Sequence, residues 1–284
     1  MRWTRTRTCW WRGPNTCGWR RACGTGCRRC RRIRCRTARF SSCWVSIEPP
    51  PAGADPAFKE DPMTDYSTTR DRVEHYFDRT ATHTWERLTS SAPVSRVRQT
   101  VREGRDTMRA KMLWRLPKDL TGLRVLDAGC GAGQMTAELA ARGAQVTAVD
   151  ISPQLVEIAR KRLPPEHLDR VTFASGDMLS DDLGPFDYVV AMDSLIYYTD
   201  EDIAKALDKL GARTRHSVVF TVAPRTPFLM AFWWMGKLFP RSDRSPVMIP
   251  HPFRPLNEAT GDRLVKIGRV SRGFYISECL EFRP

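Results

Sequence analysis

The sequence predicts an α/β protein with a doubly wound, mostly parallel sheet, a helical segment before it and an antiparallel hairpin at its C-terminal end. From Leu123 onward, short apolar runs alternate with helical patterns of about ten residues, as in the β-α-β units of parallel sheets. A glycine-rich turn, VLDAGCGAG, joins the first run to the first helix. The closing stretch LVKIGRVSRGFYISECLEF holds two alternating runs around residues 271–273, which indicates a hairpin.

Residues 1–62 differ in composition from the rest of the chain. They hold 14 Lys and Arg against 4 Asp and Glu, and seven of the nine cysteines. The net charge of +14 therefore belongs mainly to this segment and does not indicate a nucleic-acid surface on a folded domain. Its one C-x-x-C, Cys27 to Cys30, has no second pair or nearby His for a zinc site. We expect a disordered or mis-annotated extension, a native start at Met63, and no bound metal.

Residues 63–118 are predicted to form a helical cap. The stretch DYSTTRDRVEHYFDRTATHTWERL reads as one or two helices, and a further helix follows Pro93. In that second helix apolar residues recur near 3.6-residue spacing while arginines occupy the other faces. These apolar residues are Val94, Val97, Val101, Met108 and Met112.

Residues 119–284 are predicted to form the ligand-binding domain. Its strands are expected at 123–129, 144–150, 171–177, 186–193 and 216–223. Helices are expected at 134–142, 153–163 and 200–210, between those strands. Parallel strands end at the same edge of a sheet, so the turns after them should lie together.

The glycine-rich turn narrows the class of ligand. Asp127, Gly129, Gly131 and Gly133 end the first strand and open the helix. A dinucleotide fingerprint needs another glycine at position 134, which is Gln134, and no G-K-S/T triplet marks a P-loop. The pattern D-x-G-x-G-x-G resembles motif I of the class I S-adenosylmethionine-dependent methyltransferases, which implies their Rossmann-like fold. A carboxylate there suits an ammonium group and would repel a diphosphate.

Two further acids stand at consecutive strand ends. Asp150 ends the second strand, where a carboxylate can take both ribose hydroxyls, and Asp177 follows the third. The resemblance implies that Asp177 lies near the adenine amino group and that Ile151 and Met178 also contact the cofactor. Taken singly, Asp150 or Asp177 has the alternative interpretation of a helix cap or turn residue, and the specific signal is their combination with the glycine-rich turn.

A closer resemblance covers the chain from Met63 to Pro284. The stretches RVEHYFDRTATHTWERL, VAMDSLIYY and FLMAFWWMGKLFPRSDRSPVMIPH resemble the magnesium-protoporphyrin IX O-methyltransferases of purple bacteria. The resemblance implies methyl transfer from S-adenosyl-L-methionine to a propionate carboxylate, with magnesium as part of the substrate and a substrate-binding insertion at 224–256. A methyltransferase for another lipophilic molecule, such as a quinone, stays the alternative.

The resemblance also implies which residues face the acceptor. A porphyrin needs apolar and aromatic surface together with cations for its carboxylates. The residues expected at the methyl group are Asp193, Tyr197 and Tyr198, and those expected to bind substrate are His75, Tyr76, Trp85, Arg105, Phe232, Trp233, Trp234, Arg241 and Arg244. Core packing and shallow membrane contact are the alternative interpretations of the aromatic run.

Partners and location follow from the same resemblance. We expect a porphyrin substrate, a magnesium chelatase subunit as its donor, and no nucleic acid. The two cysteines after residue 62, Cys130 and Cys279, fit a reducing cytoplasm. Peripheral contact with the inner or intracytoplasmic membrane would suit a hydrophobic substrate.

Overall fold

The computed structural model describes residues 66–77, 95–227, 229–230 and 248–284, all within one compact unit, Lys59–Pro284. The predicted extension, residues 1–62, lies outside the described residues. So do several predicted substrate contacts, namely Trp85, Phe232, Trp233, Trp234, Arg241 and Arg244. The predicted domain boundaries at residues 62 and 118 stay predictions.

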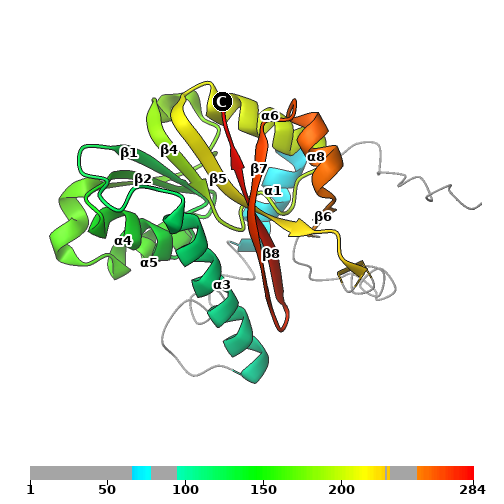
Figure 1. Ribbon diagram of the computed structural model, residues 1–284. Helices are drawn as coiled ribbons and strands as arrows, with labels where there is room; N and C mark the ends of the chain where they lie inside the picture. The colour runs from blue at the N-terminus through cyan, green and yellow to red at the C-terminus, as the bar shows by residue number, and fades with distance from the viewer. Residues whose placement is uncertain (1–65, 78–94, 228, 231–247) are drawn as a thin grey trace, which may run out of the picture. The chain divides into compact units, whose positions relative to one another are not determined.

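An eight-stranded sheet runs through this unit (Figure 1). The strands are β1 (Arg124–Ala128), β2 (Gln145–Asp150), β3 (Val171–Ser175), β4 (Phe186–Ala191), β5 (Thr214–Pro224), β6 (Pro250–His251), β7 (Leu264–Arg272) and β8 (Tyr275–Phe282). Their order is β3-β2-β1-β4-β5-β8-β7, with β6 beside β5. β1 to β5 run parallel, and β8 is antiparallel to both β5 and β7. The predicted fold class, with its closing hairpin, is confirmed.

Helices cover both faces of the sheet. The α-helices are α1 (Tyr66–Tyr76), α3 (Arg96–Trp114), α4 (Gln134–Ala141), α5 (Pro153–Arg162), α6 (Asp200–Gly211) and α8 (Phe253–Ala259). Two short 3-10 turns, η3 (Pro165–Arg170) and η4 (Asp181–Leu183), were not expected. Side chains of β1 alternate between the faces, so Val125 packs with α3 and α4 whereas Leu126 packs with α6 and α8.

The strand order reverses at β1, which leaves a crevice at the carboxyl ends of β1 and β4. β1 continues through α4 to β2 on one side, while β4 pairs with its other side. In open α/β sheets ligands bind outside the strand ends at such a reversal. The fold therefore brings the glycine-rich turn and the turn after β4 to one place.

The two halves of helix α3 differ in their burial. Ser95 caps its N-terminus by accepting a hydrogen bond from the Arg98 amide at 3.4 Å. Met108 and Met112, in the C-terminal half, are fully buried, as their spacing predicted. Val97 is 49% exposed, so the predicted apolar face is wrong there. The reason is that the N-terminal half of α3 lies beside the β7–β8 hairpin rather than under the sheet (Figure 1).

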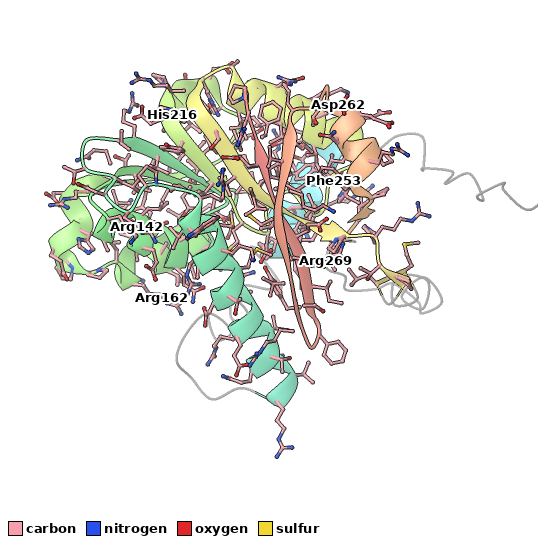
Figure 2. All side chains as sticks on the ribbon, in the orientation of Figure 1. Arg142, Arg162, His216, Phe253, Asp262 and Arg269 are labelled. Carbon is pink, nitrogen blue, oxygen red and sulfur yellow. The ribbon has the colours of Figure 1, made fainter. Side chains whose placement is uncertain are left out.

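The short strand β6 fixes the end of the predicted substrate insertion. The Ile249 amide donates to the Ile196 carbonyl at 2.9 Å, and His251 Nδ1 is a hydrogen-bond partner of Asp200 Oδ1. The next element, α8, begins at Phe253 (Figure 2). The centroid of its ring lies 4.6 Å from the Lys266 ammonium of β7. The chain returning from the insertion is thus bonded to the turn between β4 and α6.

Candidate cofactor and substrate pocket

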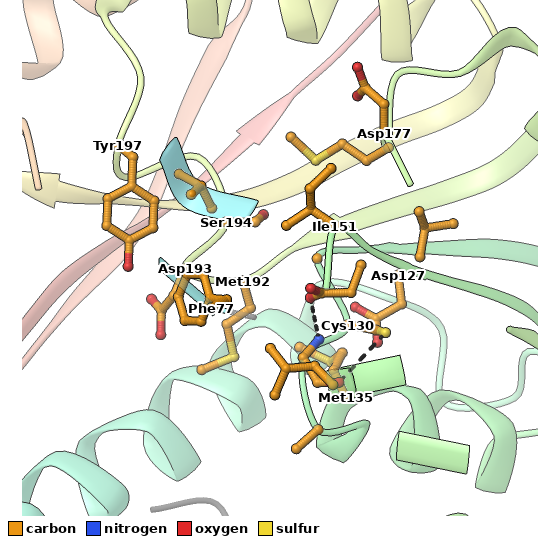
Figure 3. Close-up of a pocket in the computed structure, with 18 of the residues that line it drawn as sticks. Phe77, Asp127, Cys130, Met135, Ile151, Asp177, Met192, Asp193, Ser194 and Tyr197 are labelled. Atoms are coloured by element: carbon orange, nitrogen blue, oxygen red, sulfur yellow. Dashed lines mark hydrogen bonds between the residues drawn. The ribbon is translucent and has the colours of Figure 1, made fainter. Parts of the chain in front are cut away.

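A pocket opens where β1 to β4 end (Figure 3). Its empty volume is about 1030 Å³, open solvent at its mouth included. The turns after all four strands line it, together with side chains from α1 and α3. Each predicted cofactor motif therefore contributes to a single cavity.

The glycine-rich turn adopts a backbone that only glycine takes easily. Gly133 has φ +83°, and a Cβ there would lie 2.8 Å from the Cβ of Ala159 on α5, so this glycine serves helix packing. Gly131 has φ +53°, and a Cβ there would meet nothing within 4 Å. The space next to Gly131 belongs to the pocket, which leaves the backbone open to a ligand.

Asp127 lies buried at the end of β1. Its Oδ2 accepts a hydrogen bond from Thr136 Oγ1 at 2.6 Å. Burial raises the pKa of Asp127 to about 7, and the nearby Asp150 charge adds to the rise while the Thr136 hydrogen bond opposes it. A cationic group entering the pocket beside Asp127 would favour the ionised form.

Asp150 is oriented by two backbone amides. Gly131 donates to Oδ2 at 2.8 Å and Ser152 donates to Oδ1 at 3.0 Å. These two bonds fix the orientation of the carboxylate at the wall of the pocket. The contact of this carboxylate with a ribose stays a prediction.

Asp177, after β3, is bonded to the N-terminal helix. It accepts hydrogen bonds from Tyr66 at 2.9 Å, Arg70 at 3.2 Å and the Leu179 amide at 2.8 Å. The Tyr66 ring also stacks on Tyr198, with centroids 4.8 Å apart. Helix α1 is thereby fixed to two of the four strand-end turns.

The carboxylate of Asp193, after β4, receives donors from three distant elements. Arg105 of α3 bonds Oδ2 at 2.5 Å, while Thr221 of β5 and Tyr275 of β8 each donate to Oδ1 at 3.1 Å. The backbone of Asp193 has φ +57°, which is uncommon outside glycine. This network holds the start of the turn that carries Tyr197 and Tyr198.

Both tyrosines of that turn line the pocket. Burial is the main cause that raises the pKa of Tyr197, and the same holds for Tyr198. Their hydroxyls therefore stay protonated near neutral pH, which disfavours a role as bases. The Tyr197 and Phe77 rings pack edge to face, with their centroids 6.4 Å apart.

Most predicted site residues within the described ranges meet at this pocket. Those that line it are Arg105, Asp127, Gly129, Gly131, Asp150, Ile151, Asp177, Met178, Asp193, Tyr197 and Tyr198. Gly133 instead packs against Ala159 of α5, and His75 is exposed. The Tyr76 and Phe77 rings pack edge to face, with their centroids 5.2 Å apart. The part of the chain that the structure describes holds no group of His, Cys, Asp or Glu suited to a metal ion.

The pocket also contains residues that the sequence interpretation missed. Tyr66, Arg70 and Val73 line it from α1, and Phe77 lines it from the position just after that helix. Their spacing of four, three and four places them on one face of a helix, so the signal was present. What the sequence lacked was any sign that this face turns toward Asp177.

The sheet order, the glycine turn and the three strand-end carboxylates define a class I S-adenosylmethionine-dependent methyltransferase. A family described as "Methyltransferase domain" matches residues 125–216. A second, described as "Magnesium-protoporphyrin IX methyltransferase C-terminus", matches residues 191–284.

The particular family follows from the whole-chain comparisons. The chain is 68% identical over 222 residues to the magnesium-protoporphyrin O-methyltransferase of Rhodobacter capsulatus. This match covers 78% of this chain and 99% of that protein. The crystal structure of magnesium protoporphyrin IX methyltransferase from Synechocystis with bound SAH matches with a TM-score of 0.65 and 29% identity, over 78% of this chain and 100% of that one. This chain belongs to the magnesium-protoporphyrin O-methyltransferase family, as its motifs predicted.

Proposed function

We propose that this chain transfers a methyl group from S-adenosyl-L-methionine to a propionate carboxylate of magnesium-protoporphyrin IX, giving the monomethyl ester in bacteriochlorophyll biosynthesis. The observation that carries the proposal is that Asp127, Asp150 and Asp177, from three strand ends, line one pocket with the Tyr197 turn. The 68% identity to the Rhodobacter capsulatus enzyme supports the choice of acceptor.

The carboxylates supply the proposed cofactor contacts. Asp127 would face the ammonium group, Asp150 the ribose hydroxyls and Asp177 the adenine. Three donors already hold Asp177, so the adenine amino group would share that carboxylate with α1. The remaining proposed contacts are Gly129, Gly131, Gly133, Ile151 and Met178.

The acceptor side of the proposal rests on α1, α3 and the insertion. Arg105 and Tyr197 line the pocket beside Phe77 and Met192, which provide apolar surface. Trp85, Phe232, Trp233, Trp234, Arg241 and Arg244 stay proposed substrate contacts outside the described residues. His75 and Tyr76 also stay proposals, with Tyr76 placed next to Phe77.

The proposed reaction needs orientation more than it needs a base. S-adenosyl-L-methionine, when bound, supplies an electrophilic methyl group on a positively charged sulfur. A propionate is ionised at neutral pH, so the chain has no proton to remove from it. Tyr197 and Tyr198 would position the acceptor as donors, Asp193 would fix their turn, and burial would exclude water.

The test is an assay of the purified protein with magnesium-protoporphyrin IX and methyl-labelled S-adenosyl-L-methionine. We expect the label to appear in a monomethyl ester. Alkaline hydrolysis of that ester should release the label as methanol. Absence of ester, with the cofactor shown to bind, would overturn the choice of acceptor. A parallel assay with a quinol tests the alternative, and methylation of the quinol alone would establish it.

Porphyrin delivery and location belong to the same proposal. We infer that a magnesium chelatase subunit hands the porphyrin over, and that the cytoplasmic protein meets the inner or intracytoplasmic membrane through its aromatic insertion. Among the described helices, none has the length and apolar character to span a bilayer. Sedimentation with membranes, with and without a Trp233→Ser, Trp234→Ser change, would test the contact.

A further inference from the structure

Three arginines line the pocket, and two of them are bonded to pocket carboxylates. Arg70 donates to Asp177 at 3.2 Å, and Arg105 donates to Asp193 at 2.5 Å. Arg70 also bonds Asp71, outside the pocket lining, at 2.8 Å. Asp127, Asp150 and Arg109 are the other charged side chains that line the pocket.

The partner of Arg109 lies outside the pocket lining, unlike Asp177 and Asp193. Arg109 Nη2 lies 2.8 Å from Asp106 Oδ1, one helical turn earlier on α3. The Asp106 side chain is 48% exposed and lies outside the pocket lining, whereas that of Arg109 is 15% exposed. Water screens a partly exposed pair of this kind, so it holds its members weakly. Arg109 can therefore exchange Asp106 for an anion in the pocket.

The position of Arg109 is set by its helix. Arg105 and Arg109 are one turn apart, so they share a face of α3, and the neighbouring Met108 and Met112 are fully buried against the sheet. Arg115, nearer the helix end, is bonded to Glu281 of β8 at 2.7 Å. The guanidinium of Arg109 is thus presented by a rigid element and not by a loose surface side chain.

We propose that Arg109 is the carboxylate-binding residue of this pocket. The inference rests on the proposed function, because both ligands of that reaction carry carboxylates. A guanidinium suits a carboxylate since its planar N–H groups can form two parallel hydrogen bonds. The carboxylate belongs either to a propionate of the porphyrin or to the methionine part of the cofactor, and the experiment separates these sources.

The experiment compares matched ligand pairs on wild-type protein and Arg109→Gln. Magnesium-protoporphyrin IX is titrated against its dimethyl ester, and S-adenosylhomocysteine against methylthioadenosine, which lacks the amino-acid part. We expect wild type to prefer the carboxylate-bearing member of each pair. Arg109→Gln should lower one of these preferences at least tenfold, and the affected pair identifies the source. Arg109→Lys should retain part of the preference that Arg109→Gln loses.

Two further variants exclude a purely structural role. Arg98→Gln makes the same substitution on an exposed part of α3 and should leave both preferences unchanged. Asp106→Asn breaks the intrahelical pair, and we expect equal or tighter binding of the carboxylate-bearing ligand. Unchanged preferences in Arg109→Gln, or the same loss in Asp106→Asn, would overturn the inference. Ester formation by wild type tests the proposed function separately, so the two can fail independently.

Discussion

At the scale of single residues, the buried carboxyl of Asp127 changes its charge close to neutral pH. Its pKa of about 7 arises mainly from burial. In the ligand-free protein the group is protonated below that pH and ionised above it. An ammonium ligand requires the ionised form.

We therefore expect the affinity for S-adenosyl-L-methionine to fall about tenfold as pH drops from about 8 to about 6. Calorimetric titration across this window measures it. Asp127→Asn should bind more weakly at every pH and lose the pH dependence. An equally steep dependence in Asp127→Asn would assign the effect to another group.

Two glycines of the same turn should respond differently to substitution. Gly131→Ala places its Cβ in open space and so costs only the strain of a positive φ, about 1–2 kcal/mol of unfolding free energy. Gly133→Ala adds a contact at 2.8 Å with Ala159 and should destabilise more. Urea unfolding measures both changes.

The order of the two variants should be the opposite for cofactor affinity. Gly131→Ala projects its methyl group into the pocket and should impair binding more than Gly133→Ala does, when each is compared on folded protein. If both variants lost affinity in proportion to stability, Gly131 would have no separate ligand role.

At the scale of elements, α3 and the β7–β8 hairpin form one support for the Asp193 network. A Cβ on Gly104 would lie 2.7–2.9 Å from three side-chain atoms of Tyr275, so this glycine lets the helix reach the ring. At the hairpin's end, Arg272 is bonded to Glu103 at 2.8 Å. The spacing of Tyr275 from Arg105 is consequently fixed by packing.

Gly104→Ala should push α3 away from the hairpin and cost about 1–3 kcal/mol of unfolding free energy. Because Arg105 and Tyr275 both bond Asp193, we also expect the turnover rate to fall more than the cofactor affinity. Thermal unfolding and steady-state kinetics measure these effects. Ala110→Gly, on the exposed side of the same helix, is the control for a change in helix propensity. A wild-type turnover rate in Gly104→Ala would show that the contact between Gly104 and Tyr275 does not affect catalysis.

The sequence predicted elements well where the signal is local. The glycine turn, Asp150 and Asp177 were found because each lies at the end of an apolar run. The bonds from Tyr66 and Arg70 to Asp177 span 111 and 107 residues, and no periodicity encodes them. Tyr275 was missed for the same reason, since it contacts Asp193 across 82 residues.

At the scale of the whole unit, α1 closes one side of the pocket although it precedes the sheet in the chain. Tyr66 and Arg70 bind it to the β3 turn, and Phe77 meets Tyr197 of the β4 turn. The helix therefore spans from the proposed cofactor end to the proposed acceptor end. Its own stability should change when either ligand binds.

Arg70→Gln should accelerate dissociation of S-adenosylhomocysteine several-fold, because one of the bonds between α1 and the β3 turn is lost. Overall stability should change by less than about 1 kcal/mol, since this ion pair is partly exposed. Stopped-flow displacement measures the off-rate. Arg72→Gln, on the exposed side of α1, should dissociate at the wild-type rate. Equal rates in all three proteins would exclude a role for α1 in retention.

The burial of Asp127 also has a consequence for energetics that affinity alone does not report. A carboxyl that is partly protonated at neutrality must release its hydrogen ion to the solvent when a cation docks beside it. The heat of cofactor uptake should then differ between buffers of unlike ionisation enthalpy. That difference counts the fraction of a hydrogen ion expelled per site.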